Sequence, residues 1–148
     1  MEKINETPAD KVVITVETAI NATLEKVWNC WTLPEHITKW NHASDDWHCP
    51  AAENDLRTGG KFSYTMAAKD GSFSFDFWGV YTEVVKHKKI SIILGDDRKM
   101  EVLFEEKDGK NAVQESFEAE NMNSLALQRG GWQSILDNFK KHTENISL

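Results

Sequence analysis

The N-terminal part of the chain changes from a strand pattern to a helix pattern. From residue 11 to residue 20, the run KVVITVETAI is rich in β-branched residues and alternates between two faces, which predicts a half-buried strand. The apolar stripe of a short helix follows at helical spacing: Leu24, Val27, Trp28 and Trp31. Asn21 or Thr23 can serve as the N-cap of this helix.

A second short helix is predicted directly after the first. Thr32 and Glu35 have the spacing of a capping box. Pro34 lies in the first turn of this helix, where its missing N–H is not needed. On this register, Ile37 and Trp40 face the core.

The middle of the chain predicts a loop followed by an antiparallel meander. Residues 41–57 are polar and lack periodicity, so we expect a functional or mobile loop there. Alternating segments separated by the turn signals KDG, GDD and KDG come next. We expect strands over residues 61–67, 72–85, 89–94, 99–106 and 111–118.

The longest predicted helix covers residues 123–143. Its apolar positions follow helical spacing: Leu125, Trp132, Ile135, Leu136 and Phe139. Gly130 and Gly131 interrupt the pattern, and each costs about 1 kcal/mol relative to Ala in a helix interior. We therefore expect these glycines to mark a close backbone approach or a bend.

This order of elements predicts an α+β fold, in which a curved antiparallel β-sheet wraps around the long C-terminal α-helix. The two short helices follow the first strand. The apolar face of such a sheet must be covered, and only the terminal helix is long enough to cover it. Bulky aromatic side chains on that face hold helix and sheet apart, so we expect an apolar cavity between them.

Candidate ligand-binding residues follow from strand parity, since alternate side chains of a strand share one face. The predicted set is Trp40, Trp47, Phe62, Tyr64, Phe73, Phe75, Phe77, Tyr81, Glu83, Met100, Gln128, Trp132 and Leu136. Plain core packing is the alternative for the aromatic members.

Two polar members of this set have alternative roles. Glu83 shares its parity with Tyr81, which would place a carboxylate with a raised pKa in an apolar space. A β-bulge would turn Glu83 outward instead. Gln128 lies one turn before Trp132 and either orients a ligand or caps a neighbouring strand.

Composition limits the partners of the protein. At 148 residues, we expect a polar leader over residues 1–10 and a single domain over residues 11–148. The formal net charge of −7 repels phosphate backbones and anionic lipids, so we expect no nucleic-acid binding and no membrane anchoring. The N-terminal residues carry no secretory signal, and Cys30 and Cys49 are too few for a disulfide framework. These features predict a cytoplasmic protein.

The outer face of the sheet bears on the oligomeric state. Trp78 and Val80 have the parity opposite to Tyr81, so Trp78 is exposed unless the short helices or a partner chain cover it. We expect a monomer or a weak homodimer.

No metal site, cofactor or catalytic residue is predicted. The 41–57 stretch contains ligand types that zinc accepts, namely His42, Asp45, Asp46, His48 and Cys49, but their spacing matches no tight metal motif. We expect them to be solvated at the mouth of the cavity, with Trp40 and Trp47 at its rim.

Four motifs occur in order along nearly the whole chain: VWNCWTLPEHITKW, DLRTGGKFSYTM, GVYTEV and GGWQSIL. Together they resemble the activator-of-heat-shock-protein-ATPase-like branch of the START/birch-allergen (SRPBCC) superfamily. The resemblance implies a helix-grip fold. Superfamily members include carriers of lipids and hormones, aromatase/cyclases, resistance proteins that sequester reactive compounds, and domains that stimulate a 90-kDa chaperone's ATPase, and fold alone does not choose among them.

We therefore predict binding of a small hydrophobic ligand, aromatic or acyl and lipid-like, in the internal cavity. One alternative is a cyclase or hydrolase that uses the same cavity, which requires at least two convergent titratable side chains. The other is a chaperone or stress-response interaction module acting through the outer surface. Full-length eukaryotic activators resemble this chain only through their second domain, which makes a chaperone partner the weaker expectation.

Overall fold

Alternating buried and exposed side chains build seven strands in residues 12–146, the part of the chain that the computed structural model describes. The strands are β1 (Val13–Ile20), β2 (Trp47–Asn54), β3 (Lys61–Ala68), β4 (Ser74–Val85), β5 (Lys89–Leu94), β6 (Lys99–Lys107) and β7 (Lys110–Glu118). They form one antiparallel sheet in the order β1-β7-β6-β5-β4-β3-β2. The predicted leader over residues 1–10 lies outside the described residues.

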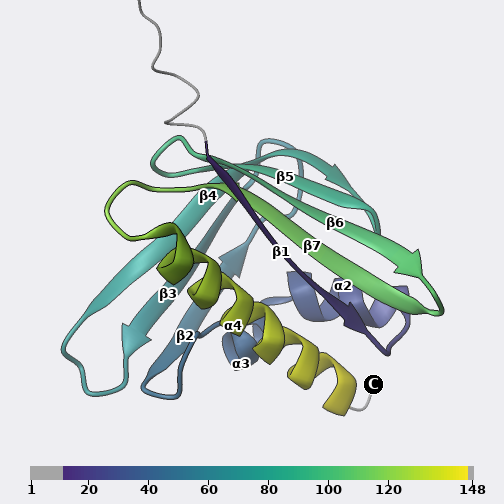
Figure 1. Ribbon diagram of the computed structural model, residues 1–148, viewed down its shortest axis with the longest axis horizontal. Coiled ribbons are helices and arrows are strands. Elements are labelled where there is room, and N and C mark those ends of the chain that lie inside the picture. Colours follow the sequence, from purple (N-terminus) through teal and green to yellow (C-terminus); the bar gives the residue numbers. More distant parts are fainter. Residues whose placement is uncertain (1–11, 147–148) are drawn as a thin grey trace, which may run out of the picture.

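Three helices in this part of the chain cover the concave side of the sheet: α2 (Leu24–Thr32), α3 (Pro34–Trp40) and α4 (Leu125–Asn145). The chain leaves β1 at one edge of the sheet and enters β2 at the other, so α2 and α3 connect the two edges. Helix α4 runs along the concave side and packs against β1 (Figure 1). The predicted α+β helix-grip fold is confirmed.

Two β-bulges interrupt the sheet, one in β4 between Tyr81 and Glu83 and one in β2 between His48 and Ala51. Each bulge bends its strand and increases the local twist, which helps the sheet to curl around α4. The β6–β7 hairpin closes tightly because Asp108 and Gly109 both adopt positive φ, 56° and 80°. This pair of angles is typical of a two-residue hairpin turn.

Aromatic side chains join the three helices. The ring of Trp31 in α2 stacks on that of Trp40 in α3, with 5.1 Å between the centroids. Phe139 in α4 contacts both rings edge-on, at 4.9 Å and 5.0 Å. Phe139, Leu136 and Ile37 are fully buried here, so this cluster fixes the C-terminal half of α4.

Two local predictions are wrong. The expected loop over residues 41–57 contains β2, an edge strand in which Pro50 lies at the bulge. Proline is tolerated at such a position because its missing N–H breaks no ladder bond. The capping box is also absent, because Thr32 ends α2 and donates a hydrogen bond to the Trp28 carbonyl at 2.8 Å.

The glycine pair in α4 marks no close backbone approach, which was one of the two alternatives predicted, and a bend stays a prediction. Helix α4 is continuous through Gly130 and Gly131. A Cβ added at either position would meet no atom of the rest of the described chain within 4 Å. The two glycines therefore weaken the helix without improving its packing.

Trp78 is partly covered by its own chain. A Cβ on Gly95 would lie only 2.4 Å from the indole ring, so Gly95 provides the space in which the ring lies. The Lys61 ammonium lies 4.6 Å from the ring centroid, a cation–π distance. Trp78 remains 39% exposed, and the monomer or weak homodimer stays a prediction.

We expect Gly130→Ala and Gly131→Ala each to raise the free energy of unfolding by about 0.5–1 kcal/mol, because Ala lowers the backbone entropy cost of the helix. Urea denaturation measures this change. Gly60→Ala is the control, since its Cβ would lie 2.0 Å from the Asp55 carbonyl oxygen, and it should destabilise. A lower stability of the Gly130 and Gly131 variants would contradict the account of α4.

Candidate functional site

A cavity of about 190 Å³ lies between the inner face of the sheet and the helices. Its wall consists mainly of apolar side chains from β3 to β7 and from all three helices. The lining residues are Trp31, Thr32, Trp40, Asn41, Asn54, Phe62, Tyr64, Met66, Phe75, Phe77, Tyr81, Ile90, Ile92, Met100, Val102, Glu115, Trp132 and Ile135.

Eight of the thirteen predicted ligand-binding residues line this cavity: Trp40, Phe62, Tyr64, Phe75, Phe77, Tyr81, Met100 and Trp132. Strand parity brings most of them together, because alternate positions of β3 and β4 point to the concave side. Contact with a ligand remains a prediction for each of them.

Trp132 separates α4 from the sheet. Its indole ring stacks on Phe117 of β7, with the centroids 3.8 Å apart and the planes 15° apart. Phe77 of β4 meets the same indole edge-on at 5.8 Å. One large side chain thus spans from the helix to the sheet and forms part of the cavity wall.

Aromatic rings also mark the mouth of the cavity. Phe75 lines the cavity and is 45% exposed, so the cavity reaches the surface beside it. Trp47 and Phe73 pack around Phe75, with all three centroid distances between 6.0 and 6.2 Å. Trp47 and Phe73 thus lie outside the cavity, at its rim. Trp40, which we expected at the rim, is buried in the interior.

Three further predicted residues lie outside the cavity. The β4 bulge turns Glu83 outward, where its carboxylate pairs with the Lys89 ammonium at 3.2 Å. Gln128 closes the β7–α4 connection, accepting from the Glu120 N–H and donating to the carbonyls of Glu120 and Asn123. Leu136 is fully buried in the core. The structure agrees with the alternatives left open for two of them, a β-bulge that turns Glu83 outward and a capping role for Gln128. Leu136 does not line the cavity, contrary to the prediction.

The sequence analysis missed a buried acid, Glu115 of β7, in the cavity wall. Glu115 shares its parity with Val113 and Phe117, both buried on the inner face. This alternation was the signal that could have found it. Glu115 is only 5% exposed.

The surroundings of Glu115 are apolar. On the neighbouring strands it lies directly opposite Val16 of β1 and Val102 of β6, both buried. Among residues 12–146, no group forms a hydrogen bond or ion pair with its carboxyl. Burial without a partner raises the pKa of Glu115 from 4.5 to about 8, because the apolar surroundings disfavour the charged form. At neutral pH this side chain is mostly a protonated acid that can donate a hydrogen bond.

Other polar groups in the wall satisfy one another. The Tyr81 hydroxyl donates to the Asn54 side-chain oxygen, and the Asn54 amide donates to the Thr32 carbonyl at 2.7 Å. Burial raises the pKa of Tyr81 to about 12 and raises that of Tyr64 as well. Both phenols are therefore neutral. Glu115 differs from this network because its hydrogen-bonding capacity is unused within the described chain.

The metal-ligand types of the 41–57 stretch do not converge on one point within the described residues. The described helices also include none with the length and apolar character needed to cross a membrane.

The sequence matches the family described as "Activator of Hsp90 ATPase homolog 1-like protein" over residues 21–144. The chain belongs to this family. A comparison with curated proteins gives no match.

Solved structures agree with this assignment. An AHSA1-like protein from Aeromonas hydrophila is 41% identical, with a TM-score of 0.84 over 93% of this chain and 99% of that one. Chr148 from Cytophaga hutchinsonii is 50% identical, with a TM-score of 0.79 over 92% and 93% of the two chains. CV1439 from Chromobacterium violaceum, at 19% identity and a TM-score of 0.81, covers 91% of this chain and 99% of its own. That last similarity shows the shared fold alone.

We expect Glu115 to make stability fall as pH rises. The unfolded carboxyl ionises near pH 4.5 and the folded one near pH 8, so unfolding releases a proton between these values. The free energy of unfolding then decreases across this window by up to about 1.4 kcal/mol per pH unit. Urea denaturation from pH 5 to pH 8 should show a smaller decrease for Glu115→Gln. The difference between the two proteins removes the contribution of the other titrating groups. Equal slopes of the free energy of unfolding against pH would contradict the assignment of Glu115 as a buried acid.

Proposed function

We propose that this protein binds a small hydrophobic molecule, aromatic or acyl, in the cavity between α4 and the sheet. The observation that carries the proposal is an apolar cavity of about 190 Å³ that reaches the surface beside Phe75. Apolar cavities of about 150 Å³ already take up benzene. The volume therefore suits one or two fused rings or a short acyl chain.

Burial of apolar surface supplies most of the binding free energy in this proposal, at roughly 25 cal/mol per Å². Trp132, Phe77 and Val102 offer flat or branched apolar surfaces for this contact. Glu115 adds a single directional group in the same wall. A ligand with a hydrogen-bond acceptor opposite Glu115 would be preferred over its hydrocarbon analogue, because it pairs a buried polar group.

Glu115 also supports a second candidate function, proton transfer to or from a substrate held in the cavity. A carboxyl with a pKa of about 8 exchanges protons readily near neutral pH. Tyr64 and Tyr81 place two neutral phenol groups in the same wall. Native mass spectrometry of freshly purified protein and of Glu115→Gln tests this candidate. A turnover enzyme should retain a different small molecule once its acid is removed, whereas a carrier should retain the same one.

We expect Val102→Phe to weaken ligand binding at least tenfold, because the added ring occupies the cavity beside Glu115. Val85→Phe is the matched control, since Val85 lies on the exposed side of β4. The affinity of this variant for each probe should stay within twofold of that of the parent protein. Isothermal titration calorimetry with indole, 1-naphthol and octanol measures both variants. The proposal fails if the parent protein binds none of these probes and no small molecule co-purifies with it.

A further inference from the structure

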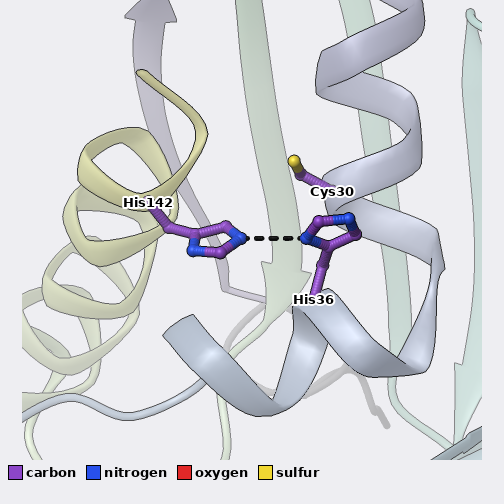
Figure 2. A group of neighbouring side chains, drawn as sticks. All are labelled: Cys30, His36 and His142. Carbon is purple, nitrogen blue, oxygen red and sulfur yellow. Dashed lines mark hydrogen bonds between the residues drawn. The ribbon is translucent and has the colours of Figure 1, made fainter. Parts of the chain in front are cut away.

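Three metal-ligating side chains from three helices meet away from the cavity wall. They are Cys30 of α2, His36 of α3 and His142 of α4 (Figure 2). The sulfur and one nitrogen from each imidazole all lie within 4.8 Å of one another. His36 Nδ1 and His142 Nε2 face each other at 3.0 Å and share a hydrogen bond.

We propose that Cys30, His36 and His142 bind a zinc-type divalent transition-metal ion. Zinc accepts thiolate sulfur and imidazole nitrogen, and sites with three protein ligands keep the fourth tetrahedral position for water or another small ligand. Tetrahedral Zn–N bonds of about 2.0–2.1 Å place two nitrogens about 3.3 Å apart. The facing imidazole nitrogens need to separate by only a few tenths of an ångström from their present 3.0 Å.

The sulfur has to move further than the imidazoles. Bonds of about 2.3 Å to sulfur and about 2.0–2.1 Å to nitrogen place these atoms about 3.6 Å apart in a tetrahedral site. The sulfur therefore has to approach the imidazoles by up to about 1.2 Å from the 4.8 Å limit of the group.

A buried hydroxyl lies beside Cys30. Thr143 is 0% exposed, and its hydroxyl is close enough to interact with the Cys30 sulfur. A metal-bound thiolate is a stronger acceptor for this hydroxyl than a thiol is, and outer-shell groups of this kind orient the ligands at metal sites.

The donor set and the nearby charges decide which ions suit this site. Imidazole nitrogen and thiolate sulfur are ligands that zinc-type ions accept. The positive charges of Lys26 and Lys39 act on His142 and disfavour any cation, and a metal-bound thiolate offsets one of these charges. The site therefore favours ions that bind sulfur and nitrogen strongly over Mg²⁺ and Ca²⁺, which need oxygen ligands.

Cobalt(II) is the probe for this site, because a cysteine ligand gives Co²⁺ a thiolate-to-metal charge-transfer band and a tetrahedral site gives intense visible bands. Titration of the full chain should show one Co²⁺ per chain with both features. Cys30→Ser should abolish the charge-transfer band. Cys49→Ser is the matched control, because Cys49 is also a buried free thiol, and it should keep the band.

Two further variants keep the test decisive if Cys30→Ser fails to fold. His142→Gln should weaken Co²⁺ binding at least a hundredfold, whereas His48→Gln, a half-buried histidine in β2, should leave it unchanged. Zn²⁺ should displace Co²⁺ and raise the Tm of the parent protein but not of His142→Gln. Absence of a one-to-one complex, or equal loss of the band in the Cys49 variant, overturns the proposal. Neither result depends on whether the apolar cavity binds a ligand.

Discussion

The structure depends on a helix that covers the concave face of the sheet without filling the space beneath it. Trp132, stacked on Phe117 at 3.8 Å, holds the middle of α4 off the sheet. Phe139, packed between Trp31 and Trp40, fixes the later turns of the helix. Large rings at these two places hold the helix away from the sheet, and an apolar cavity remains beneath it. The aromatic residues that support α4 on the sheet thus determine where the cavity lies.

Glu115 gives the wall of this space a buried carboxyl. An apolar side chain at this position would match Val113 and Phe117 on the same face of β7 and would avoid the free-energy cost of burying a carboxyl. The acid instead lies in the wall without a partner in the described chain, and burial raises its pKa to about 8. Unpaired, strongly perturbed acids of this kind concentrate at functional sites. The same wall thus supplies apolar contact and one directional group.

Local periodicity predicted the fold and part of the cavity, because alternation and helical stripes are properties of neighbouring residues. Bulges interrupt the alternation twice. The bulge at Pro50 breaks the pattern of β2, a segment that was expected to be a loop, and the bulge in β4 turns Glu83 outward, which was the alternative prediction for this residue. Parity places Glu115 inside with Val113 and Phe117, but a carboxyl is rarely buried without a partner, so its residue type gave no reason to expect it there. Cys30 and His142 lie far apart in sequence and meet only because α2 and α4 pack together. Local sequence patterns do not predict how distant helices pack, so this cluster could not be predicted from them.

Diffraction from crystals of this protein pressurised with xenon tests the central claim most directly, because xenon enters ligand-sized apolar cavities and leaves well-packed cores empty. The account predicts a xenon atom in the cavity, between Trp132 of α4 and Val102 of β6, on the concave side of the sheet. Xenon found only on the surface, with Trp132 and the strand side chains packed against each other across that space, would contradict it.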